Sequence, residues 1–256
     1  MITLCLQCSP LDLQQAFELT QLICDIEPRR RDNTEFFLVY RKDCPSWVAK
    51  NWEQLVRAKF ARVGARMARN HDTGWPGGPN MLAGSAFIEM TILRREGALQ
   101  NSGVLLFEPD CIPLAKDWLD RLSAEWAQTE AQGLEACGHW HDGGPMELHM
   151  NGNAIWMADF FDRHPTWIVG SGCQGWDFFF RDKYLPISRD TNLIFQHWNR
   201  HGISEAELDA LVKNGIHFTH VRLVVDNPAI NLHPRVSLEG HLLAANDHCS
   251  LNTVGP

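Results

Sequence analysis

The strongest constraint on the fold is an alternation of short apolar runs with amphipathic segments, repeated four times within the first 133 residues. The apolar runs have the length and composition of buried strands. They cover residues 2–6, 36–40, 62–67 and 103–107. The segments that follow them carry apolar residues at helical spacing, over 11–26, 46–60, 81–93 and around 118–126. Such alternation predicts an α/β fold of Rossmann type, with a mostly parallel central sheet flanked by helices.

After residue 133 the pattern changes to shorter pieces separated by glycine-rich turns. We expect strands at 134–141, 153–157 and 167–169, and helices at 175–183, 190–201 and 204–214. The last helix has Ser204 and Glu207 at the spacing of a capping box, and Gly215 at its end. The sequence therefore predicts one domain in two halves, 1–133 and 134–235, followed by a weakly patterned tail over 236–256.

Composition limits the classes of function. The 256 residues include 23 Lys and Arg against 31 Asp and Glu, a net charge of −8, which argues against a broad nucleic-acid-binding surface. The first residues lack the basic start of a signal peptide, and no apolar run is long enough to cross a bilayer, so we expect a soluble cytoplasmic protein. The ten Trp residues either line a cleft for sugars or bases or belong to the core.

The eight cysteines stand singly along the chain, and most lie in apolar runs. Buried free thiols are therefore expected rather than disulfides. Cys5 and Cys8 form a C-x-x-C pair, but no second pair follows to complete a four-ligand zinc site.

Ligands of an open parallel sheet bind outside the carboxyl ends of its strands. The residues that follow the first two strands, Ser9 with Pro10 and Arg41 with Asp43, suit the base and ribose of a nucleotide. After the third strand, the loop 74–80 ends at Asn80, which suits a helix cap or a sugar contact. Neither G-x-G-x-x-G nor G-x-x-x-x-G-K-[ST] is present, so a bound diphosphate needs another counter-charge.

Glu108 and Asp110 supply that counter-charge, because they directly follow the apolar run G-V-L-L-F. Two carboxylates at this position can face a metal and a ribose hydroxyl, and such hard oxygen ligands suit Mg²⁺ or Mn²⁺. The competing interpretation is an ordinary solvated acidic turn.

The order of I-T-L-C-L-Q-C-S-P, G-P-N and L-L-F-E-P-D-C-I-P resembles the GT-A fold of nucleotide-sugar-dependent glycosyltransferases, over roughly residues 2–225. In that fold a D-x-D signature after the fourth strand binds Mn²⁺ and the donor diphosphate. The resemblance implies that Asp110 is the metal ligand and that Glu108, which departs from the signature, assists it. It also implies a further ligand from a late histidine, for which we favour His220 over His217.

The resemblance further implies a general base at the start of a late helix, and G-C-Q-G-W-D matches that element. Asp177 would then take the acceptor proton, and Trp176 could stack on a sugar or base. The alternative is that Asp177 caps its helix. Among the glycine-rich turns, His139 and His141 could line the acceptor cleft or share a zinc ion, with 149–153 as a turn nearby.

Together these features predict a metal-dependent glycosyltransferase that moves a sugar from a nucleoside diphosphate, most plausibly UDP, to a hydroxyl acceptor. The acceptor could be a saccharide, a small molecule, a protein or a hydroxymethylated DNA base. Two alternatives stay open, a sugar-phosphate nucleotidyltransferase and a non-catalytic nucleotide- or carbohydrate-binding protein.

Overall fold

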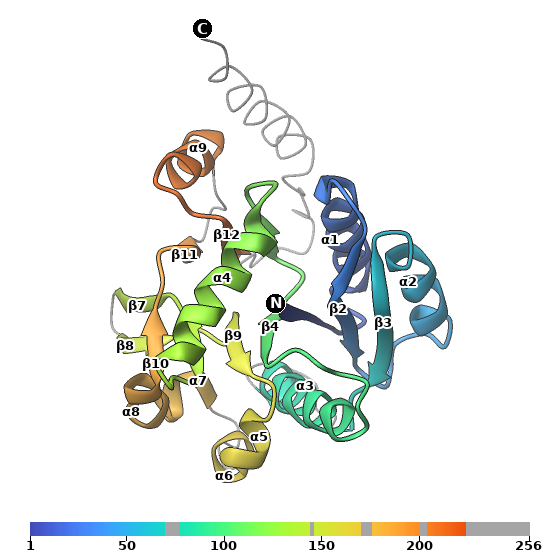
Figure 1. Ribbon diagram of the computed structural model, residues 1–256, viewed down its shortest axis with the longest axis horizontal. Helices are drawn as coiled ribbons and strands as arrows, with labels where there is room; N and C mark the ends of the chain where they lie inside the picture. The colour runs from blue at the N-terminus through green and yellow to red at the C-terminus, as the bar shows by residue number, and fades with distance from the viewer. Residues whose placement is uncertain (70–76, 144–145, 170–175, 200–203, 224–256) are drawn as a thin grey trace, which may run out of the picture.

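A seven-stranded sheet forms the centre of the molecule (Figure 1). The computed structural model describes residues 1–69, 77–143, 146–169, 176–199 and 204–223. The strand order is β10-β6-β9-β4-β1-β2-β3. The strands are β1 (Ile2–Cys8), β2 (Arg31–Tyr40), β3 (Phe60–Met67), β4 (Gly103–Phe107), β6 (Ala136–Gly138), β9 (Ala154–Met157) and β10 (Ser188–Asp190).

The predicted α/β class and mostly parallel sheet are confirmed. β1 pairs in parallel with β2 and β4, and β2 pairs in parallel with β3. β6 and β10 are also parallel to each other. β9 lies between β4 and β6 and runs antiparallel to both. The residues that precede β9 therefore lie at the same edge of the sheet as the residues that follow β4.

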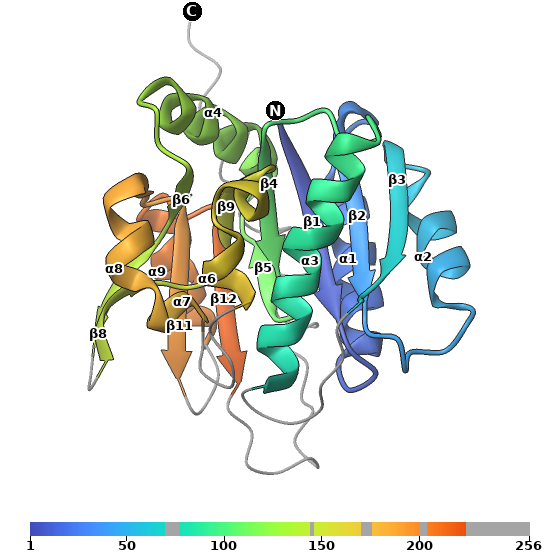
Figure 2. The same ribbon diagram turned by 90° about the horizontal axis from the view of Figure 1, so that it is seen from below.

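Helices cover both faces of this sheet (Figure 2). α1 (Leu13–Ile26), α2 (Val48–Val56) and α4 (Trp118–Ala131) contribute to the core on one face, and α3 (Gly77–Arg95) packs on the other. Large aromatic residues fill these cores, and the fully buried tryptophans are Trp52, Trp118, Trp126 and Trp156. Most of the apolar area of these side chains is removed from water, which makes them part of the core rather than of a cleft.

The cysteines of the described residues are buried and free, as expected. Side chains three residues apart on a strand point to opposite faces. Cys5 accordingly packs in the core under α3, whereas Cys8 packs in the core under α1 and α2. The C-x-x-C pair therefore does not face a common site. Cys173 and Cys249 lie outside the described residues.

Two small sheets and several short helices flank the end of the large sheet that is formed by β10, β6 and β9. β5 (Cys111–Pro113), β11 (Ile194–Asn199) and β12 (Phe218–Leu223) form one small sheet, and β7 (Trp140–Gly143) and β8 (Met146–Met150) form a hairpin. The helices are α5 (Phe160–Arg163), α6 (Pro165–Val169), α7 (Trp176–Phe179), α8 (Arg181–Tyr184) and α9 (Glu205–Lys213), with a 3₁₀ turn over Leu185–Ile187. Along the described ranges, no helix combines the length and the apolar character needed to cross a bilayer.

Two predictions for the second half are wrong. Residues 190–201 were expected to be helical, but Ile194–Asn199 forms β11, in which Ile194 and Gln196 are buried at the spacing of a strand. Residues 167–169 were expected to be a strand, but they end α6, which begins at Pro165. Proline suits the first turn of a helix because its missing N–H has no helical partner there.

The ends of two helices also bear on the predictions. α3 begins at Gly77, so Asn80 lies within its first turn and is not its cap. The predicted capping box of α9 is confirmed, because the Ser204 hydroxyl accepts from the Glu207 amide and the Glu207 carboxylate accepts from the Ser204 amide. The predicted tail over 236–256 lies outside the described residues.

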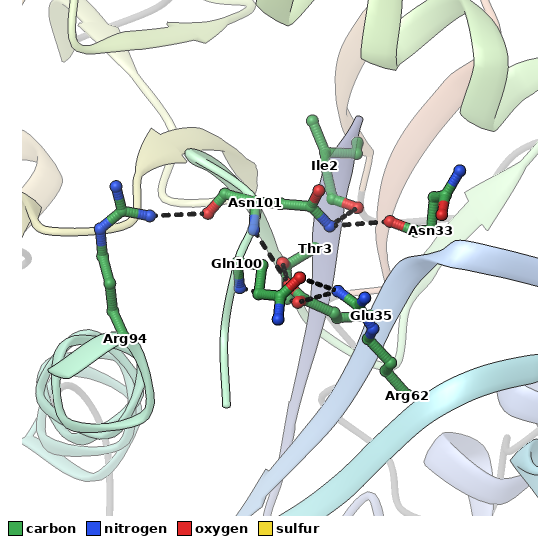
Figure 3. Close-up of polar contacts among 8 residues, drawn as sticks. All are labelled: Ile2, Thr3, Asn33, Glu35, Arg62, Arg94, Gln100 and Asn101. Carbon is green, nitrogen blue, oxygen red and sulfur yellow. Dashed lines mark hydrogen bonds and ion pairs between the residues drawn. The ribbon is translucent and has the colours of Figure 1, made fainter. Parts of the chain in front are cut away.

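A buried carboxylate ties the amino ends of the strands together (Figure 3). The Glu35 side chain, in the first half of β2, is fully buried. It accepts hydrogen bonds from the Thr3 hydroxyl at 2.5 Å, the Gln100 amide at 2.7 Å and the Asn101 amide at 3.3 Å. Arg62, from β3, contacts the same carboxylate at 3.3 Å. Four donors from three strands or their flanking loops therefore converge on one side chain at this edge.

Glu35→Gln should lower the free energy of unfolding by about 2–3 kcal/mol, because one carboxylate oxygen becomes an NH₂ group that faces other donors in a buried position. Urea denaturation measures the difference. Arg62→Gln is the matched control, since Arg62 is 40% exposed and its loss should cost about 1 kcal/mol or less. Equal losses in the two variants would contradict the role assigned to the Glu35 cluster.

Candidate functional site

The carboxyl ends of the parallel strands meet at the edge of the sheet opposite Glu35. In Figure 2 the arrowheads of β2, β3, β11 and β12 point toward the same side, and α3 begins there. Residues that follow β1, β2 and β4 reach this edge, together with the residues that precede β9. Asn80 is placed by its backbone in the first turn of α3.

At the end of β1, the loop is closed by Asp12, a residue that sequence reasoning missed. Its Oδ1 atom accepts hydrogen bonds from the Ser9 amide at 2.6 Å and from the Ser9 hydroxyl at 2.9 Å. Burial raises the pKa of Asp12 against the effect of these bonds, and the charge of Asp110 raises it further. Asp12 and Asp110 are therefore close enough to interact. Pro10, between Ser9 and α1, is exposed.

At the end of β2, Arg41 and Asp43 form a two-bond ion pair. Arg41 Nε and Nη2 lie 2.7 and 2.8 Å from the two Asp43 oxygens. The Arg41 amide also donates to the carbonyl of Cys8 at 3.0 Å, which fixes this loop to the end of β1. Arg41 is buried and Asp43 is exposed, so the pair presents a carboxylate at the edge of the sheet.

At the end of β4, the Glu108 backbone and side chain are both held by Asn153. The Glu108 amide donates to Asn153 Oδ1 at 2.9 Å, and Asn153 Nδ2 donates to Glu108 Oε2 at 3.1 Å. Asn153 is in turn fixed by Asn151, whose Oδ1 accepts from the Asn153 amide and side chain. Gln196 of β11 donates to the Asn153 carbonyl at 3.3 Å. Asn153 and Gln196 are each 2% exposed, so these bonds form in a dry interior.

Asp110 lies two residues on, and its Oδ1 atom is buried. The next residue, Cys111, pairs with His220 across the antiparallel strands β5 and β12. The backbone of His220 thus lies opposite the residue that follows Asp110. His217 instead lies 3.3 Å from Asp117 at the start of α4, and burial lowers its pKa.

The oxygen donors at this edge fit a hard divalent cation. Mg²⁺ in phosphate-binding sites commonly takes one or two carboxylates and completes its coordination with water and substrate phosphates. Asp110 and Glu108 supply such oxygens. The negative charge of Asp110 also raises the pKa of Asp12, so acidic groups gather at this edge. Within the described side chains, no three His, Cys, Asp or Glu residues form a cluster that could hold a metal by themselves.

Three histidines lie on and beside the β7–β8 hairpin. The ring centre of His141 lies 6.3 Å from that of His139 and 5.8 Å from that of His149. His139 also contacts Phe195 of β11, at 5.0 Å between ring centres. Burial lowers the pKa of His139 and of His149, and in His149 the charge of Asp177 opposes the shift. Burial therefore favours the neutral form of His139 and of His149. The residues expected as a turn at 149–150 belong to β8.

Asp177 is anchored to the segment that precedes β9. It is the second residue of α7, not its cap, and its Oδ2 atom accepts from the Gly152 amide at 3.3 Å. The Tyr184 hydroxyl donates to the Asp177 carbonyl and accepts from the Met150 amide at 3.0 Å. Trp176 directly precedes Asp177 in α7, and its side chain is not among those described.

The segment 150–153 therefore joins the two groups of candidate residues. Asn153 holds Glu108, and the adjacent Gly152 holds Asp177. Glu108 and Asp177 are thus attached to neighbouring residues, although about 70 residues of sequence separate them. Sequence reasoning missed this link, because Asn151 and Asn153 belong to no motif whose spacing signals it.

Comparisons with solved structures place the fold. Galactosyltransferase LgtC, in complex with donor and acceptor sugar analogs, matches with a TM-score of 0.51 and 12% identity, over 99% of this chain and 98% of that one. Mouse xyloside xylosyltransferase 1 matches with a TM-score of 0.53 and 10% identity, over 86% and 97%. Glycosyltransferase GlyE of Streptococcus pneumoniae gives 0.54 and 8%, over 97% and 63%. The fold is that of the GT-A glycosyltransferases.

The similar structures differ in the length of their chains. The chain spans 35% of TarS from S. aureus, with a TM-score of 0.49, 11% identity and 74% of this chain covered. Neither a comparison with protein-family models nor a search of curated sequences gives a match. The GT-A fold puts the carboxyl ends of β1, β2 and β4 at the candidate site.

His149→Gln should reduce the amount by which the free energy of unfolding falls as the pH is lowered. The folded-state pKa of His149 is lowered by burial, so its contribution is fully present above the unfolded value of about 6.5 and is lost as the pH falls toward the folded value. One proton taken up only by the unfolded chain changes the free energy of unfolding by about 1.4 kcal/mol per pH unit. Urea denaturation at pH 7.5 and 5.5 measures this slope, and an unchanged slope in the variant would refute the neutral state of His149.

Proposed function

We propose that this protein is a metal-dependent glycosyltransferase that uses a nucleoside-diphosphate sugar, with UDP as the nucleotide. The observation that carries the proposal is the attachment of Glu108 and Asp177 to adjacent residues of the segment 150–153. It joins an acidic pair suited to a cation with a carboxylate suited to accept a proton, on a GT-A fold. The names of the neighbours, which include a xylosyltransferase and a galactosyltransferase, support the same class of reaction.

Asp110 is the proposed metal ligand, with Glu108 as its helper and His220 as a further ligand. A bound Mg²⁺ or Mn²⁺ would neutralise charge on the departing diphosphate. Asn153 fixes the Glu108 carboxylate before any ligand arrives, so little side-chain freedom is lost on binding. The ring of His220 would join from β12, whose backbone lies opposite Cys111.

The nucleoside is proposed to lie across the ends of β1 and β2. Ser9 and Pro10 form the loop after β1, and Arg41 holds the Asp43 carboxylate at the edge after β2. A carboxylate fixed in this way can accept hydrogen bonds from ribose hydroxyls or from a base N–H. Asn80, in the first turn of α3, is proposed as a contact to the sugar or diphosphate.

Asp177 is the proposed general base, and His139, His141 and Trp176 are the proposed acceptor contacts. Asp177 would accept the proton of the acceptor hydroxyl in an inverting reaction. The lowered pKa of His139 keeps its imidazole neutral, so it can exchange hydrogen bonds with hydroxyl groups without attracting an anion. An uncharged, hydroxyl-bearing acceptor such as a saccharide fits these groups.

Asp110→Ala should weaken UDP binding in the presence of Mn²⁺ by at least about 100-fold, since loss of one charged partner in a shielded site costs about 3 kcal/mol or more. Isothermal titration of UDP, with and without Mn²⁺, measures the effect. Asp32→Ala is the control, because Asp32 is an exposed residue of β2 that pairs with exposed Arg30. Unchanged affinity in the Asp110 variant would refute the metal site.

Asp177→Asn should reduce sugar transfer by about 100-fold or more, with UDP affinity within about twofold of the native value. The amide oxygen of Asn can still accept from the Gly152 amide, so α7 should stay in place. Mass analysis of the acceptor product gives the transfer rate. Parallel losses of transfer and of UDP binding would mean that Asp177 is structural.

Consumption of a nucleoside triphosphate, without any transfer from nucleotide sugars, would favour a nucleotidyltransferase instead.

A further inference from the structure

Two cysteines meet beside the proposed nucleoside site. Cys8 is the last residue of β1, and Cys44 lies in the loop between β2 and α2. Two backbone hydrogen bonds set their approach, because the Arg41 amide donates to the Cys8 carbonyl and the Cys44 amide donates to the Arg41 carbonyl, each at 3.0 Å. Both side chains belong to the core under α1 and α2, and each thiol shifts the pKa of the other. The loop is therefore folded back so that two thiols from distant parts of the sequence touch.

The two thiols differ in reactivity. Cys8 is fully buried, whereas Cys44 is 9% exposed. The hydrogen bond with Cys8 lowers the pKa of Cys44, and the charge of Arg41 acts in the same direction. The same hydrogen bond and burial raise the pKa of Cys8. Because the thiolate is the nucleophile, Cys44 is the side chain that an oxidant meets first, with Cys8 next to it.

We propose that Cys8 and Cys44 form a reversible disulfide when the protein meets a peroxide. The Cys44 thiolate attacks one peroxide oxygen, the O–O bond breaks, and a sulfenic acid and one water form after proton transfer. The Cys8 sulfur then attacks the Cys44 sulfur, and the sulfenic oxygen leaves as a second water. Two thiols lose two electrons in total, and one hydrogen peroxide is reduced to two waters. A dithiol reductant restores both thiols by exchange.

The bond would change the loop that carries Arg41 and Asp43. A disulfide requires the sulfurs to be about 2.05 Å apart, which is closer than a thiol–thiol hydrogen bond. Cys44 must therefore move toward β1, and the loop from Arg41 to Cys44 must follow. This consequence rests on the proposed function, because Arg41 and Asp43 are assigned there to nucleoside binding. The formation of the disulfide does not rest on the proposed function.

Peroxide treatment of the reduced full chain, followed by thiol counting after denaturation, tests the site. The expected result is a loss of two thiols per chain and a linked peptide that joins Cys8 to Cys44, both reversed by dithiothreitol. Fragmentation of the linked peptide distinguishes Cys8 from Cys5 and Cys24, which share its tryptic fragment.

Cys8→Ser and Cys44→Ser should each abolish this link. Cys24→Ser is the matched control, since Cys24 is also buried in the same core, and it should leave the link intact. Further oxidation of Cys44 to a sulfinic acid without the link would overturn the proposal. So would a link that joins other cysteines in its place, or no loss of thiols at all.

The effect on the loop is measured by titration of UDP with Mn²⁺ before and after peroxide. Oxidation should weaken UDP binding by at least about tenfold, as a displacement of about 1 Å at a binding group can do. In Cys44→Ser the same treatment should have no effect. A linked protein that binds UDP as tightly as the reduced one overturns the coupling. Reduced protein that binds no UDP counts against the proposed function, and the peptide analysis still decides the disulfide.

Discussion

The candidate site depends on the hydrogen bonds made by the carboxamide of Asn153. The carboxamide bonds to both the amide and the carboxylate of Glu108 and donates to Asn151 Oδ1. Gln196 fixes the backbone of the same residue, because it donates to the Asn153 carbonyl. A buried amide group is costly unless all its partners are present, so the network has few alternative arrangements. The end of β4, the start of β9 and the strand β11 are consequently held in one geometry.

The same segment explains why the two halves of the chain form one site. The neighbour of Asn153, Gly152, binds Asp177, and Met150 binds Tyr184. β6 also passes close to this region, because a Cβ atom on Gly138 would lie 2.6 Å from Ala154 Cβ. Only glycine allows that approach without a shift of β9. The position of the base relative to the acids therefore follows from backbone contacts as well as from side chains.

Much of the first half could be predicted from sequence, because its strands are continuous apolar runs and its helices have a clear apolar face. Glu108 and Asp110 were identified for the same reason, as they end the run G-V-L-L-F. The second half was harder. Gln196 interrupts the apolar pattern of β11, because it is buried and donates to the Asn153 carbonyl 43 residues away, a contact that no local pattern signals. The bond between Glu108 and Asn153 spans 45 residues and has no local signal. Asp12 belongs to no motif, and its proximity to Asp110 arises from the pairing of β1 with β4.

Because β9 runs in the reverse direction, sequence changes at this edge of the sheet fall into two kinds. One kind lies in the loops that follow β1, β2 and β4, and the other lies in the segment that precedes β9. In a sheet with every strand parallel, each loop at the ligand edge would follow a strand, and a change in one would disturb the nucleotide and its partner alike. In this protein the hairpin of β7 and β8 follows β6 and leads into β9, which runs antiparallel to β4 and β6. On the proposed function, insertions or deletions in that hairpin would change the side of the site assigned to the acceptor, while β1, β2 and β4 keep their pairing.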